Sequence, residues 1–246
     1  MRLAHSVRLP HCCEAPGRVW RLNVSALILM IEEPVYPDEF EAFLDTTEGE
    51  REIAGYLKAR PWVLYWSLCR AGGHARYVLN EFKLGNQFTV DTLILNSYSG
   101  VWEAIFVELE SVTDPVFTKR RTPTQCLAQA IKQCDDWAEF AEQNRDLLRR
   151  DFVRCAKRFD KLGYTSQREP SNYTGDLLAD PSSFLQFRYV IVIGRSTRMS
   201  PETRALMGRV GARHSVDVVS YDRLLRLAQA RYGDDKSLWN EYPRVE

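Results

Sequence analysis

The chain contains two strand-like runs, Phe88-Thr-Val-Asp-Thr-Leu-Ile-Leu95 and Val101-Trp-Glu-Ala-Ile-Phe-Val-Glu-Leu-Glu110, on either side of the turn sequence Asn96-Ser-Tyr-Ser-Gly100. Branched and aromatic residues fill both runs, as is typical of strands. A third run of this kind, Arg76–Phe82, comes before them and is followed by the turn Leu84-Gly85-Asn86. Together the three runs predict a β-meander.

The segments around the meander alternate between helix and strand patterns. Apolar periodicity and turn signals predict four helices: Pro61–Cys69, the segment that follows Pro123, the segment opened by Ser200-Pro201, and Arg223–Arg231. Gly72-Gly73 ends the first of them. Strands are predicted in Tyr189–Ile193 and Val216–Ser220. The continuous apolar run at Tyr189 is typical of a buried parallel strand. We therefore expect an α/β fold with a central mixed sheet flanked by helices.

Composition bounds the function only loosely. The 246 residues carry 33 basic and 33 acidic side chains, so no global charge favours nucleic acid. Six cysteines without a paired CxxC spacing indicate reduced thiols in a cytoplasmic protein and no zinc site. Acids dominate Glu32–Glu52 and bases dominate Arg145–Lys161. The basic stretch is either a solvated helix face or a DNA-facing surface, with Arg149 and Arg150 as its phosphate contacts.

The first thirty residues show no clear structural pattern. Met1–Val24 is rich in Arg and His and lacks apolar periodicity, and Met30 is a plausible alternative start. The apolar segment Ser25–Ile31 is too short to span a membrane, so we expect no membrane partner.

Three carboxylates mark the candidate site. Glu108 and Glu110 are two residues apart on one predicted strand and so share a face, while Asp91 comes from the neighbouring strand. Carboxylates on apolar strands are costly to bury without a positive partner, and Mg²⁺ is held in proteins by a few carboxylates. The set therefore predicts a metal site, although solvated strand-end acids are an ordinary alternative.

Two further residues extend this set. Glu81 ends the first strand, ten residues before Asp91, and is a candidate for another oxygen ligand. Gln133 is a polar residue on the packed face of the helix that follows the meander. A buried amide needs hydrogen-bond partners, which either the acidic site or the helix packing would supply.

The ordered set of residues resembles the nuclease domain of the Shedu family of bacterial anti-phage defence proteins, within the PD-(D/E)XK superfamily. The resemblance rests on five segments in order: Glu81-Phe-Lys-Leu-Gly85 with Asp91, Phe106-Val-Glu-Leu-Glu110, Ala130-Ile-Lys-Gln133 with Asp136-Trp137, Val192-Ile-Gly-Arg195, and Val219-Ser-Tyr-Asp222 with Leu224-Leu225. It places a leader and N-terminal helical region in residues 1–67, the nuclease domain in 68–232 and a tail in 233–246.

This resemblance implies a restriction-endonuclease-like core that cuts DNA with Mg²⁺, or with Mn²⁺ as a substitute, in a homo-oligomer. It makes Asp91 the metal-binding aspartate, Glu108 the glutamate of the ExK motif, Glu81 the upstream acid and Gln133 the glutamine that completes the site. The activating trigger is not implied.

The departure from the family pattern is at Glu110, where the superfamily usually has lysine. Either Glu110 acts as a general base, or a lysine enters from elsewhere, with Lys119 or Lys132 as candidates and Lys83 as a weaker one. Arg195 is a candidate for binding phosphate or a neighbouring subunit, and an arginine that closes the strand end is the alternative. An inactive module that binds nucleic acid or a protein, and a purely structural α/β domain, are the alternatives to an active nuclease.

Overall fold

The structure is a computed structural model that describes residues 37–47, 49–69, 75–156, 169–172 and 174–234. The expectations for the leader, for Met30, for Gly72-Gly73 and for the tail from residue 235 lie outside the described residues. The elements are α2 (Pro37–Thr46), α3 (Glu50–Ala59), α4 (Pro61–Leu68), β1 (Ala75–Leu84), β2 (Phe88–Tyr98), β3 (Val101–Leu109), α5 (Gln125–Gln143), α6 (Arg145–Ala156), β4 (Leu185–Val192), the 3₁₀ turn η2 (Ser196–Arg198), α7 (Pro201–His214), β5 (Asp217–Val219) and α8 (Tyr221–Asp234).

The five strands form one mixed sheet in the order β1-β2-β3-β4-β5. The first three strands pair antiparallel, which confirms the predicted meander. β4 pairs parallel to β3, and β5 parallel to β4. The continuous apolar run in β4 is thus explained, because this strand is covered by helices on both of its faces. The expected α/β fold with a flanked mixed sheet is confirmed.

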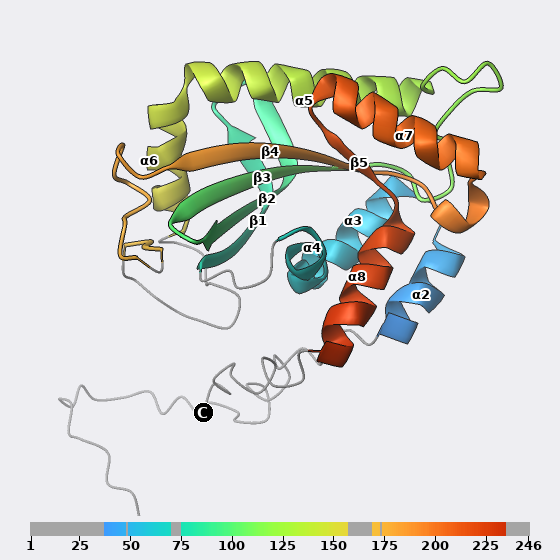
Figure 1. Cartoon of the computed structure of the whole chain (residues 1–246), viewed down its shortest axis with the longest axis horizontal. Helices are drawn as coiled ribbons and strands as arrows, with labels where there is room; N and C mark the ends of the chain where they lie inside the picture. The colour runs from blue at the N-terminus through green and yellow to red at the C-terminus, as the bar shows by residue number, and fades with distance from the viewer. Residues whose placement is uncertain (1–36, 48, 70–74, 157–168, 173, 235–246) are drawn as a thin grey trace, which may run out of the picture. The chain divides into compact units, whose positions relative to one another are not determined.

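Helices cover both faces of the sheet (Figure 1). On one face α5, α6 and α7 pack over Phe106, and the fully buried Trp137 of α5 anchors this layer. On the other face α2, α3, α4 and α8 pack over Ile105 and Val107. Because α2–α4 share this core with the strands, they belong to the same compact unit as the other described elements.

The face presented by β1 and β2 changes at one point along the sheet. Leu79 and Phe82 both enter the α5 layer although they are three positions apart, and Val90 and Leu93 do the same on β2. Strand side chains alternate, so each strand must switch faces between these positions. Glu81 has a positive φ of 54°, and it lies opposite Asp91, between the pairs Asn80↔Thr92 and Phe82↔Val90. The switch therefore occurs at the two acids.

Arg195 connects the end of β4 to the helices of the second layer. Its side chain is only 4% exposed, and its guanidinium donates to Asp222 of α8 at 2.8 Å and to Asp45 of α2 at 2.9 Å. Asp222 is itself buried, and it also accepts a bond from the backbone N–H of Thr197. The pair thus ties η2 and α8 to the sheet.

We expect Arg195→Met to lower the free energy of unfolding by about 3 kcal/mol, because it leaves the buried Asp222 carboxylate without its partner. The double variant Arg195→Met/Asp222→Asn should recover part of this loss, since no unpaired charge then remains. Urea denaturation followed by circular dichroism measures both. Arg198→Met, an exposed change in the same loop, is the matched control, and equal stability of Arg195→Met and this control would contradict the assignment.

Candidate functional site

Asp91 lies where β2 leaves β3. The last hydrogen-bonded pair between these strands is Thr92↔Val107, which makes Asp91 and Glu108 the next opposite positions. Beyond that pair the Asp91 carboxylate accepts the backbone N–H of Leu109 at 2.8 Å. Burial raises the pKa of Asp91, this hydrogen bond opposes the rise, and repulsion from Glu50 and Glu81 adds to it. Asp91 therefore satisfies the backbone N–H at the end of the β2–β3 ladder and contributes a carboxylate to the site.

Glu108 is the most buried of the three carboxylates, with 8% of the residue exposed. Burial, followed by repulsion from Asp91, Glu110 and Glu50, raises its pKa to about 9, and a hydrogen bond from Gln133 partly offsets the rise. Its Oε2 has no hydrogen-bond partner among the described residues. The structure thus brings Glu108 and Gln133 together, and it leaves one carboxylate oxygen without a partner.

Glu110 directly follows β3, and two hydrogen bonds fix its backbone. Its N–H donates to Val192 O at 2.9 Å, and its carbonyl accepts the hydroxyl of Tyr221 at 2.6 Å. Burial, then repulsion from Glu50, Asp91 and Asp114, raises the pKa of its side chain to about 7. The charged groups that shift this pKa are all acids, so the surroundings of Glu110 are negative.

Glu50, the first residue of α3, is a fourth acid that the sequence analysis missed. Burial is the main cause of the raised pKa values of Asp91, Glu108, Glu110 and Tyr221, and the charge of Glu50 adds to each rise. The acidic run Glu32–Glu52 was visible in the sequence, but no spacing singled out Glu50. Only the packing of α3 against β3 brings it near the strand ends.

Glu81 and two of the candidate lysines contact residues other than the three carboxylates. Glu81 is exposed and pairs with Lys58 at 2.8 Å, which lowers its pKa. Lys132 pairs with Asp136 at 2.6 Å, and Lys83 donates to Thr89 at 2.7 Å. Lys119 is exposed in the loop between Phe117 and Pro123.

These residues fit a hard cation in donor chemistry, although they do not form a complete ligand set. In the part of the chain that the structure describes, no Lys or Arg forms an ion pair with Asp91, Glu108 or Glu110. Within the same residues, no three His, Cys, Asp or Glu side chains are grouped so as to hold a metal ion. The Asp91–Glu108 pair, with its free Oε2, offers hard oxygen ligands. Mg²⁺ usually completes such a partial set with water and phosphate oxygens.

The arginine candidates for DNA contact fall into two groups. Arg149 is 4% exposed and donates to the carbonyl of Leu178 at 3.1 Å and to that of Ser183. Arg195 is equally buried and bonded to Asp222 and Asp45. These contacts favour a structural role for both. Arg150 is exposed on α6 and keeps its side chain available.

The family follows from a comparison with known sequences. The family model described as Shedu protein SduA, C-terminal, matches residues 47–225, well over half of the chain. The chain belongs to this Shedu family. Membership supports a role in antiviral defence. The matched range contains all four acids, Gln133 and the complete sheet of this Shedu domain.

A search of curated proteins finds no match for this Shedu-family chain. Among the described residues of the Shedu domain, no helix has the length and apolar character needed to cross a membrane.

We expect the metal-free protein to lose stability as pH rises. Between the ordinary pKa of 4.5 and the folded value of about 9, the folded Glu108 carboxyl holds a proton that the unfolded one has lost. The free energy of unfolding therefore falls with rising pH, by at most about 1.4 kcal/mol per pH unit. Glu108→Gln should flatten the thermal midpoint measured in EDTA from about pH 5 to about pH 9.

Glu52→Gln is the control for this measurement, because Glu52 is an exposed acid of α3. Its profile should follow the wild type. Parallel profiles for wild type and Glu108→Gln would show that the burial of the Glu108 carboxylate has no such effect.

Proposed function

We propose that this Shedu domain is a Mg²⁺-dependent DNA endonuclease of the PD-(D/E)XK type, acting in anti-phage defence. The observation that carries the proposal is the pair Asp91 and Glu108, which lie opposite each other where the β2–β3 ladder ends. One of their oxygens lacks any partner among the described residues. Carboxylate oxygens at the point where two strands separate are suited to binding a cation.

Asp91 and Glu108 would hold the ion, which supplies a lowered pKa for an attacking water and neutralises charge on the phosphate. Gln133 orients Glu108 through its hydrogen bond. Glu110 would accept the proton of the attacking water, a role supported by its half-buried carboxylate and by the backbone bonds to Val192 and Tyr221.

A basic loop supports DNA as the substrate. Lys119, Arg120 and Arg121 are exposed at the tip of a turn closed by the bond from Thr118 N to Thr122 O at 2.9 Å. A hydrogen bond with Ser200 is the main cause of the lowered pKa of Glu202 at the start of α7, and the charge of Arg121 adds to it, so this loop lies close to that helix. We propose that this loop binds the phosphate backbone, which any DNA presents regardless of sequence.

The second candidate is a Shedu-derived module that binds DNA without cutting it. Two observations favour it: the acidic surroundings of Glu110, and the lack of a grouped set of three ligands in the described part of the chain. Metal binding separates the candidates, because an inactive module should show no saturable binding of Mg²⁺ that depends on the carboxylates.

We expect the purified chain to nick or cut plasmid DNA with Mg²⁺ or Mn²⁺. Asp91→Ala and Glu108→Ala should each lower the rate at least about a hundredfold, because each removes a ligand of the cation that would neutralise the charge of the transition state. Agarose gels of supercoiled plasmid follow the reaction. Glu52→Gln should cut like the wild type, and equal cleavage by all four proteins would remove the assignment.

Isothermal titration with Mg²⁺ provides a test that does not depend on cleavage. We expect saturable binding that Glu108→Gln abolishes and Gln133→Leu weakens about fivefold, because the amide no longer favours the ionised form of Glu108. If Gln133 were only a core glutamine, Gln133→Leu would bind Mg²⁺ like the wild type and have a higher thermal midpoint. That outcome would support the purely structural alternative.

A further inference from the structure

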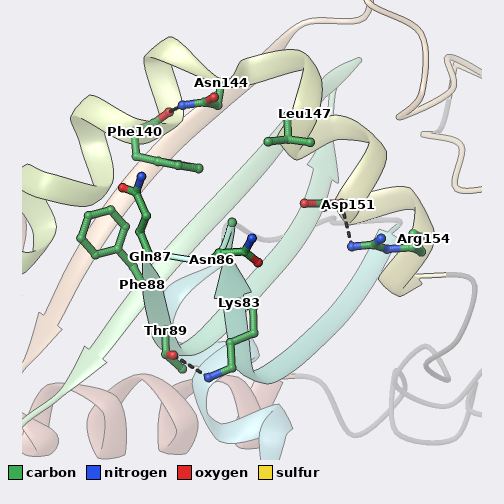
Figure 2. A pocket seen from close by; sticks show the side chains of 11 residues that line it. Lys83, Asn86, Gln87, Phe88, Thr89, Phe140, Asn144, Leu147, Asp151 and Arg154 are labelled. Atoms are coloured by element: carbon green, nitrogen blue, oxygen red, sulfur yellow. Dashed lines mark hydrogen bonds and ion pairs between the residues drawn. The ribbon is translucent and has the colours of Figure 1, made fainter.

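A pocket of about 820 Å³ opens between the tip of the β1–β2 hairpin and the α5–α6 corner. Figure 2 shows its lining side chains, which come from the hairpin on one side and from the two helices on the other. Neither the carboxylate site nor the basic loop uses them. The lining residues are Lys83, Gly85, Asn86, Gln87, Phe88, Thr89, Phe140, Asn144, Leu147, Asp151 and Arg154. We call this the hairpin-tip pocket.

The apolar part of the pocket consists of two rings and a leucine. Phe88 and Phe140 meet edge to face, with ring centroids 6.0 Å apart, and both are only partly buried. Leu147 is 37% exposed beside them. Gly85 has a positive φ of 60°, and a Cβ there would lie 2.7 Å from the Phe140 ring. Glycine thus allows the hairpin to approach the ring, whose remaining surface is available to a flat ligand.

The polar part offers both hydrogen-bonding amides and positive charge. Asn86 and Gln87 are exposed, and their side-chain amides make no hydrogen bond to the described residues. Lys83 donates to the hydroxyl of Thr89 and forms no ion pair among the described residues. Arg154 forms an ion pair with Asp151 at 2.8 Å, and its side chain remains 61% exposed. The rim therefore combines free amides with two cations and one acid.

We propose that the hairpin-tip pocket binds a nucleotide, with its base against Phe88 or Phe140, its base edge at Asn86 or Gln87, and its phosphate at Lys83 and Arg154. Unstacked bases are bound in proteins by aromatic stacking, amide hydrogen bonds and a cationic path for the backbone. A purely apolar ligand would bury the amides and cations without partners, at a cost in free energy.

The position of the pocket points to a nucleotide of the DNA strand. Thr89 is two residues from Asp91 on β2, which is roughly 7 Å along a strand. The inference rests on the proposed DNA substrate, and its role there is to hold an unpaired nucleotide that flanks the scissile phosphate. A free mononucleotide has the same chemistry, so the experiment must separate the two sources.

Fluorescence anisotropy of the full chain in EDTA tests the proposal without cleavage. The probes are a labelled duplex with a single-stranded overhang, a blunt duplex and a mixture of deoxynucleoside monophosphates as competitor. We expect Lys83→Gln/Arg154→Gln to weaken overhang binding about tenfold and to lower the salt dependence by about 1.4 in logarithmic slope, as for two lost contacts to single-stranded DNA. Phe140→Leu should also weaken binding, about fivefold, through lost stacking.

Arg223→Gln on α8 is the matched control, because Arg223 is an exposed cation in the helical layer on the other face of the sheet. It should bind every probe like the wild type, and thermal midpoints check that all variants are folded. Loss of overhang binding supports the DNA strand as the source. Loss confined to mononucleotide competition supports the free nucleotide. Wild-type binding of all probes by both pocket variants overturns the proposal.

A photo-crosslink gives a second measurement. An overhang with 4-thiothymidine next to the duplex should crosslink to the peptide that contains Phe88 or Phe140, as identified by mass spectrometry. Crosslinks found only at other peptides would overturn the placement. A chain that fails to cut DNA but shows this crosslink would refute the proposed catalysis while the nucleotide pocket stands.

Discussion

The separation of β2 from β3 is the constraint on which the site depends. A sheet edge that opens must satisfy the backbone groups it releases, and here the Asp91 carboxylate accepts the N–H of Leu109. The face switch at Glu81 and Asp91 allows the β1–β2 hairpin to leave the sheet and still keep Phe82 and Val90 in the core. Without this opening, Asp91 and Glu108 would be ordinary members of a closed ladder.

The separation of the two strands gathers several acidic side chains in a partly buried site. Burial raises the pKa values of Asp91, Glu108 and Glu110, and the negative charge of Glu50 adds to each rise. Such a cluster is destabilising by itself, since each group favours the form that carries no charge. The two helical layers provide the compensating stability, with Phe106 and Trp137 buried on one face and Ile105 and Val107 on the other. The unfavourable free energy of the buried carboxylates is tolerated because the core around them is extensive.

Periodicity predicted the strands, the mixed sheet and the cap of α7, because each depends on local pattern: Ser200, for example, accepts the N–H of Thr203 at 3.2 Å as expected of an N-cap. The meeting of Glu108 with Gln133 followed from their faces and from the family pattern. Glu50 and the buried states of Arg149 and Arg195 were not predictable in this way. They depend on which helix packs against which strand, and a charged residue looks the same in the sequence whether it is solvated or bonded to a distant carbonyl.

The hydroxyl of Tyr221 links the first residue of α8 to the carbonyl of Glu110. α8 is docked in turn by Ser67, which bonds the carbonyl of Leu224 at 3.0 Å, and by the Arg195–Asp222 pair. A rotation of α8 about its axis would therefore move the backbone of Glu110. The docking of α8 and the position of the Glu110 backbone are thus coupled through the hydroxyl of Tyr221.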